Sequence, residues 1–167
     1  PPGAPRHRPV NAPAMPTSAP ISVTDTPQAL DRLVQAFEGL SPDTLPALVA
    51  LYAADARFKD PFNDVQGQAA IEAIFRHMFT ALHEPRFVVT ERVQQGQQVF
   101  LTWDFCFRFR RFDTVTPQTV RGASHLVFNE QGRVTLHRDY WDAAEELYEK
   151  LPVVGGLMRW LKRRANS

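Results

Sequence analysis

The chain has 167 residues, of which 44% are hydrophobic, and carries a net charge of +1 at pH 7. This length suits one domain with a substantial core, and the nearly balanced charge argues against a nucleic-acid binder that works by charge. Its one cysteine, Cys106, excludes an internal disulfide and a cysteine-based metal site, and we expect a reducing, cytoplasmic setting.

Residues 1–25 are rich in proline, and we predict a disordered tail there. Half of the 14 prolines of the chain fall in this segment. We expect one folded domain over residues 26–151 and a basic amphipathic helix over residues 152–167. We expect that helix to cap the domain or to pack on a partner subunit, in preference to lying on an anionic membrane surface.

Two helices are predicted to open the domain. Thr26 and Pro27 provide an N-cap and a proline at the first helical position, and Ser41-Pro42 starts the second helix. Apolar residues recur at helical spacing in both helices: Leu30, Leu33, Val34, Phe37 and Leu40 in the first, and Leu45, Leu48, Val49 and Tyr52 in the second.

A short strand over residues 57–60, a loop over 64–67 and a long amphipathic helix over 70–82 are predicted next. After Pro85 the apolar period changes to two, which is typical of strands. Two hairpins and a further helix are expected, with strands over 86–93, 99–109, 119–128 and 133–141 and the helix over 143–151. This order predicts an α+β domain with a strongly bent sheet.

The strand over residues 99–109 has one continuous apolar face. Trp103, Phe105 and Phe107 lie on that face, which the helices must cover. Such a row can belong to the core or line a cavity. A bent sheet leaves a hollow, so a lining role in a substrate cavity is the functional interpretation.

Lys59-Asp60-Pro61 is the segment that first indicates chemistry. Pro61 restricts Asp60 to extended geometry, so its carboxylate should lie at a strand end in a fixed direction. Phe58 and Phe62 are apolar neighbours on the same side. A carboxylate among aromatic rings loses solvation and can act as a proton acceptor. The alternative is an ordinary turn aspartate.

The predicted last strand carries a second set of candidates. His137, Asp139 and Trp141 share one face of it, and the imidazole and the carboxylate lie about 7 Å apart along the strand. That distance lets both act on one small ligand. The alternative is an exposed pair on a solvated face, but Trp141 on the same face argues against it.

The segments YAADA (52–56) and KDP (59–61) resemble a motif of the ketosteroid-isomerase, SnoaL-like and nuclear-transport-factor-2-like superfamily. The resemblance covers about residues 26–142. It implies a cone in which a curved antiparallel sheet wraps around N-terminal helices and encloses a pocket. It also implies a homodimer formed through the outer sheet face. It suggests Asp60 as general base, as in the isomerases, or Asp139 as acid/base residue, as in SnoaL-like cyclases.

Two positions depart from the isomerase pattern. Where the isomerases have a tyrosine and a protonated aspartate that hold the enolate oxygen, this chain has Leu33 and Ser124. A base without such donors loses a large part of the transition-state stabilisation, so steroid isomerisation is not expected. Ser124, a protonated His137 or Tyr52 are the candidate replacements.

Metal and cofactor signals are weak. His77, His83 and His137 are not spaced like metal ligands, and no glycine-rich phosphate loop occurs. A metal site formed by Asp60, His137 and Asp139 is the less favoured alternative. We therefore expect no metal and no cofactor.

The sequence thus predicts a small-molecule enzyme of isomerase, cyclase or hydratase type that acts on an apolar carbonyl compound. Asp60 or Asp139 would take a proton, and His137 would return it or polarise the oxygen. The predicted substrate-binding residues are Tyr52, Trp103, Phe105, Phe107, Ser124 and Trp141. The alternative is a non-catalytic ligand-binding or accessory dimerisation domain of the same fold.

Overall fold

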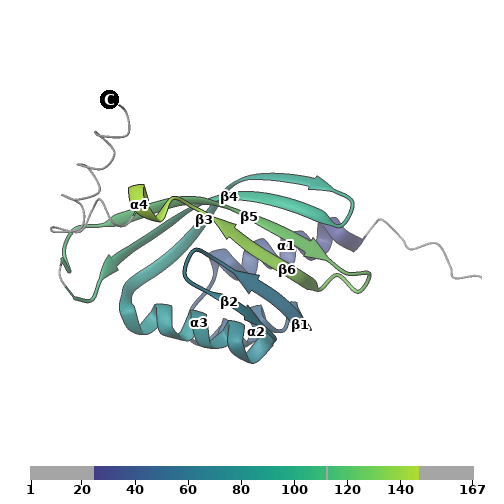
Figure 1. The fold of residues 1–167 in the computed structure, drawn as a ribbon, viewed down its shortest axis with the longest axis horizontal. Coiled ribbons are helices and arrows are strands. Elements are labelled where there is room, and N and C mark those ends of the chain that lie inside the picture. Colours follow the sequence, from purple (N-terminus) through teal and green to yellow (C-terminus); the bar gives the residue numbers. More distant parts are fainter. Residues whose placement is uncertain (1–24, 112, 147–167) are drawn as a thin grey trace, which may run out of the picture.

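The computed structural model describes residues 25–111 and 113–146, so most of the predicted tail and the whole of the predicted basic C-terminal helix lie outside the described residues. The described part contains a six-stranded curved sheet, with helices α1, α2 and α3 on one side of it (Figure 1). The predicted α+β class is confirmed. No helix in this part of the chain is both long and apolar enough to cross a membrane.

The first helix forms as predicted, but the second is much shorter than expected. Helix α1 spans Asp25–Glu38, and helix α2 spans only Leu45–Val49. Ser41 and Thr44 bind each other's backbone N–H groups with their hydroxyls, at 2.8 and 3.2 Å, which holds the preceding turn outside the helix. The prediction that Tyr52 lies on this helix is wrong, because it is the first residue of strand β1.

Strand β1, Tyr52–Lys59, has two neighbours in the sheet. It pairs antiparallel with β2, Asp64–Gln66, where the sequence predicted a loop. Arg57 and Lys59 both bind the Asp64 carboxylate across this pair, at 2.8 and 3.0 Å, which helps to hold so short a strand.

The other neighbour of β1 is β6, Val134–Tyr140, and this pair is parallel. The sequence predicted antiparallel pairing for the four long strands, which the structure confirms, and the short β1 adds to them by this one parallel pair. The register places Phe58 opposite His137 and Lys59 opposite Arg138. It follows that the ends of β1 and β6, which carry the candidate carboxylates, meet at the same edge of the sheet.

The remaining elements follow the predicted order. Helix α3 spans Gln68–Ala81 and starts after Gly67, whose φ of 92° favours glycine. The strands and the last described helix are β3, Leu82–Gln95; β4, Gln98–Phe109; β5, Gln118–Phe128; and α4, Ala143–Glu146. The sheet order is β2-β1-β6-β5-β4-β3.

Strand β3 starts at Leu82, before Pro85, whereas the sequence predicted a start just after this proline. The register shifts between His83 and Arg86, and Glu84 between them has a φ of 50°. Proline is tolerated in an edge strand at such an irregularity, where no ladder hydrogen bond is lost.

The core lies between the concave sheet face and the helices. Val99, Leu101, Trp103 and Phe107 of β4 are buried, as the period-two pattern predicts, and Phe105 is partly buried. Helix α1 supplies the other side of this layer with Leu30, Leu33, Val34 and Phe37.

Candidate functional site

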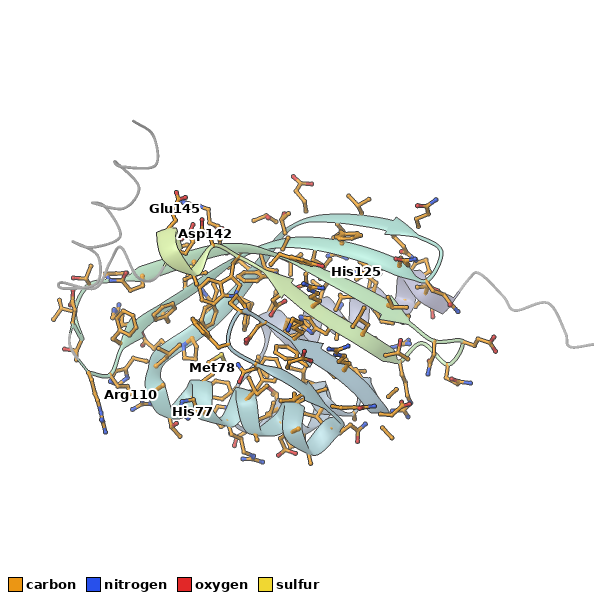
Figure 2. The ribbon with its side chains drawn as sticks, in the orientation of Figure 1. His77, Met78, Arg110, His125, Asp142 and Glu145 are labelled. Atoms are coloured by element: carbon orange, nitrogen blue, oxygen red, sulfur yellow. The ribbon has the colours of Figure 1, made fainter. Side chains whose placement is uncertain are left out.

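The ends of β1 and β6 form one wall of a cavity of about 550 Å³. Asp60 and Asp139 both line it, because they follow the paired residues Lys59 and Arg138 on adjacent strands. The other lining residues are Lys59, Pro61, Arg138, Tyr140, Trp141 and Asp142. Figure 2 labels Asp142 beside α4, well away from His77 on α3.

Five side chains from four strands form a continuous hydrogen-bonded series, which we call the Asp139 network. Oδ1 of Asp139 lies 2.8 Å from Nε2 of His137 and 2.5 Å from Oγ of Ser124. Nδ1 of His137 lies 2.7 Å from the hydroxyl oxygen of Tyr52, and Nε1 of Trp103 donates to Oγ of Ser124 at 2.8 Å. The network joins β1, β6, β5 and β4 across the concave face.

His137 lies behind Asp139 and is only 3% exposed. Its ring has edge contacts with Phe58 and Phe37, at centroid distances of 4.8 and 5.6 Å, and is parallel to the ring of Tyr52. Both of its nitrogens are engaged within the network. The structure thus brings His137 to Asp139 but does not place it in the cavity wall.

Asp60 lines the cavity, but its carboxylate also organises the turn after β1. Oδ1 accepts hydrogen bonds from the backbone N–H groups of Phe62 and Asn63, at 2.7 and 2.6 Å. The Asn63 side-chain amide donates to both carboxylate oxygens, at 3.0 and 2.9 Å. This arrangement is typical of a turn aspartate. A catalytic role for Asp60 stays a prediction.

The predicted aromatic lining divides into two groups. Trp141 lines the cavity, and its ring contacts Phe62 at a centroid distance of 5.4 Å. The residues that line it do not include Trp103, Phe105 or Phe107. Phe105 instead stacks on Phe87 of β3, at a centroid distance of 4.5 Å. A substrate-binding role for these three residues stays a prediction.

Gly122 was not predicted, although it decides where the Trp103 indole lies. A Cβ atom built on Gly122 would lie 2.4 Å from the Trp103 ring, far inside contact distance. The two residues are direct cross-strand partners, so the bare glycine lets the indole lie flat and reach Ser124. An isolated glycine in a strand pattern signals such close approach.

Within the residues that the structure describes, no group of three or more His, Cys, Asp or Glu side chains is placed to hold a metal ion. The Asp139 network instead joins one carboxylate to an imidazole and a hydroxyl. What the arrangement can do is hold and move a proton at Asp139.

A SnoaL-like domain model matches residues 32–137, which is more than half of the chain. The chain belongs to the SnoaL-like domain family. The resemblance seen in the YAADA and KDP segments is thereby confirmed, and the search of curated proteins finds no match.

Solved structures with the same fold are similar to this SnoaL-like domain. A protein from Catenulispora acidiphila with a ketosteroid isomerase-like fold, crystallised with trimethylamine, is 20% identical, with a TM-score of 0.62 over 73% of this chain and 91% of that one. An NTF2-like protein from Burkholderia pseudomallei is 21% identical, with a TM-score of 0.63 over 73% and 94%. A protein from Shewanella putrefaciens described as a SnoaL-like polyketide cyclase is 18% identical, with a TM-score of 0.61 over 72% and 96%. At these identities the likeness shows the fold.

Tyr52 gives this SnoaL-like domain a predictable sensitivity to alkali. Burial raises the pKa of Tyr52 well above its ordinary value, and the charge of Asp139 raises it further. Tyrosine in the unfolded chain titrates near pH 10, so above that pH the unfolded state loses a proton that folded Tyr52 keeps. Linkage then lowers the free energy of unfolding as pH rises, by up to about 1.4 kcal/mol per pH unit.

The measurement is urea unfolding at pH 8 and pH 11 for the wild-type protein and Tyr52→Phe. The wild type should lose more stability between the two pH values than Tyr52→Phe does. Tyr140→Phe, whose ring is 47% exposed, should behave like the wild type. Equal losses in all three proteins would show that Tyr52 ionises as readily in the folded state as in the unfolded one.

Proposed function

We propose that this SnoaL-like domain is an acid–base enzyme that takes a proton from the carbon next to the carbonyl group of an apolar small molecule. Isomerase and cyclase reactions of carbonyl compounds start with this step, and a hydratase takes the same proton when it runs in the dehydration direction. The observation that carries the proposal is the environment of Asp139, whose two carboxylate oxygens differ.

Oδ1 of Asp139 accepts from both His137 and Ser124. Oδ2 has no hydrogen-bond partner among the described residues, and the Asp139 side chain, which lines the cavity, is 15% exposed. A general base needs a fixed direction and one oxygen within reach of the ligand proton. Asp139 fits this requirement better than Asp60, whose two oxygens both accept hydrogen bonds from the turn.

The carbonyl oxygen of the ligand needs a donor. The hydroxyl of Ser124 already donates to Asp139, and both ring nitrogens of His137 are engaged. Trp141 lines the cavity and makes no hydrogen bond within the described residues. We therefore propose the Trp141 indole N–H as the donor for the developing oxyanion, with His137 and Ser124 acting through Asp139.

The walls of the cavity favour a ligand with an apolar body. Pro61, Trp141 and the ring of Tyr140 provide apolar surface. The similarity in fold to a protein described as a SnoaL-like polyketide cyclase supports a carbonyl-bearing ligand.

Proton exchange with solvent tests the proposal before a substrate is known. The protein is incubated in D₂O with a panel of cyclic and aromatic ketones, and loss of the α-proton signal is followed by NMR. We expect catalysed exchange in at least one compound, because an isomerase, a cyclase and a hydratase in its dehydration direction all take a proton next to the carbonyl. No exchange above the buffer rate across the panel would count against the enzyme.

One observation favours the second candidate, a ligand-binding or accessory domain. Every buried side-chain nitrogen and oxygen in the described residues has a hydrogen-bond partner, so the buried part of the Asp139 network is satisfied without any ligand. A satisfied buried network can specify the packing of the core without having any catalytic role. Native mass spectrometry discriminates the two, since a co-purifying hydrophobe without exchange activity favours binding.

A cytoplasmic location stays a prediction. We also propose a homodimer that forms through the outer sheet face. Val93, Phe100, His125 and Arg138 follow one another in register across β3, β4, β5 and β6. Phe100 is 48% exposed and stacks on His125 at 4.5 Å. Light scattering after size exclusion should give twice the chain mass, and Phe100→Glu should give a monomer. A wild-type monomer at high concentration would refute the dimer.

A further inference from the structure

The hydrogen bonds of the Asp139 network all donate toward Asp139. An indole N–H can only donate, so Trp103 gives its proton to Oγ of Ser124, and the Ser124 hydroxyl donates to Oδ1 of Asp139. An ionised carboxyl group can only accept, so Nε2 of His137 carries the proton on the other side. Two branches of the network therefore meet at Oδ1: one runs from Trp103 through Ser124, and the other runs through His137.

The second branch ends at Tyr52, which is fully buried. With the proton on Nε2, the neutral imidazole accepts at Nδ1, and the Tyr52 hydroxyl donates to it at 2.7 Å. The alternative tautomer, with the proton on Nδ1, breaks two contacts at once. Its bare Nε2 would face the Asp139 carboxylate, and its N–H would face a hydroxyl whose own proton has no other acceptor among the described residues.

We propose that Tyr52 is a positioning residue that holds His137 in the Nε2–H tautomer, and that Trp103, acting through Ser124, is the positioning residue of the other branch. Together they keep both donors on Oδ1, so that Oδ2 is the oxygen of Asp139 that meets a ligand in the cavity. The catalytic consequence rests on the proposed function, whereas the tautomer itself does not.

This role differs from a proton relay. Burial and the charge of Asp139 raise the pKa of Tyr52, so moving its proton to His137 would leave a buried phenolate near a carboxylate. During turnover the C–H bond of the ligand breaks, the proton forms an O–H bond at Oδ2, and the electron pair stays on the ligand as an enolate. A proton then returns from Oδ2 to the ligand, and in D₂O the proton held at Oδ2 exchanges for deuterium before this return, while the bonds at Oδ1 persist throughout.

The imidazole nitrogens report the tautomer directly. The experiment records long-range ¹H–¹⁵N NMR spectra of uniformly ¹⁵N-labelled protein at pH 7, with the His137 signals assigned by their loss in His137→Gln. The wild type should show a protonated Nε2 and an unprotonated Nδ1. Tyr52→Phe removes only the hydroxyl, and its His137 signals should move toward a mixture of tautomers. Tyr140→Phe, which removes an exposed hydroxyl outside the network, should leave them unchanged.

Rates give the second readout. For a ketone whose α-proton the protein exchanges, Tyr52→Phe should lower kcat by about ten- to a hundredfold with little change in KM, because Tyr52 orients the base without touching the ligand. Trp103→Phe should lower kcat while the His137 tautomer stays fixed, since it removes a donor from the other branch.

A wild-type His137 that carries its proton on Nδ1, or on both nitrogens, would overturn the inference. So would a Tyr52→Phe variant with unchanged His137 signals. If Tyr52→Phe does not fold, the wild-type spectrum alone decides. A fixed Nε2–H tautomer in a protein that exchanges no ketone would leave the positioning inference standing and remove the proposed function, so the two failures are distinguishable.

Discussion

Asp139→Asn should lower the rate of ketone proton exchange by about 10²- to 10⁴-fold, the usual contribution of a general base. The amide has nearly the shape of the carboxylate, and its oxygen can keep the two bonds from His137 and Ser124 at the Oδ1 position. Its nitrogen must then occupy the Oδ2 position, where it cannot accept a proton. The rate should fall while the fold and the thermal midpoint change little. Solvent-exchange NMR on each purified variant provides the measurement.

Two further aspartate variants make this result specific. Asp55→Asn changes an exposed carboxylate on β1 and should exchange at the wild-type rate. Asp60→Asn should retain most of the rate, because asparagine can also cap the turn after β1. A large loss in Asp60→Asn together with a small loss in Asp139→Asn would assign the base to Asp60 and contradict our proposal.

Phe58→Ala should lower the free energy of unfolding by about 3–5 kcal/mol, the usual cost of deleting a buried phenylalanine ring. Phe58 is 3% exposed and packs edge-on against Phe75 and His137, at centroid distances of 5.9 and 4.8 Å. The truncation opens a cavity beside the imidazole, so catalysis should fall as well. Urea unfolding followed by tryptophan fluorescence gives the change in stability.

The matched control is Phe100→Ala, which removes the same side chain from the outer face. Phe100 is 48% exposed in the single chain and its main contact there is the stacked ring of His125, so the expected loss is below about 1.5 kcal/mol when unfolding is measured at a protein concentration that keeps the chain monomeric. Equal losses in the two variants would show that the Phe58 layer carries no special share of the stability.

The sequence predicted well the features that depend on local periodicity. The alternation in β4 identified Trp103 as inward-facing, and the period-two rule put Asp139 and Trp141 on one face, where both line the cavity. It failed where a competing local signal existed. The helical spacing of the α2 residues extended to Tyr52, yet pairing with Val134 draws that residue into the sheet.

The candidate site depended on contacts that no local pattern contains. The parallel pairing of β1 with β6 sets Phe58 against His137. It also brings His137 within hydrogen-bond distance of Tyr52, which lies 85 residues earlier in the chain. The turn that engages both oxygens of Asp60 was visible in the sequence only as one of two alternatives. Which of the two aspartates keeps an open oxygen follows from these packed neighbours.

By itself, the sequence determined the class of the fold, the order of nearly all its elements and the face on which the residues of β4 and β6 lie, because chain geometry fixes the periods of helices and strands. Only the tertiary structure decided which strands are neighbours and hence which polar groups meet. That choice depends on burying whole faces against one another, a non-local requirement that residues far apart in the chain satisfy together.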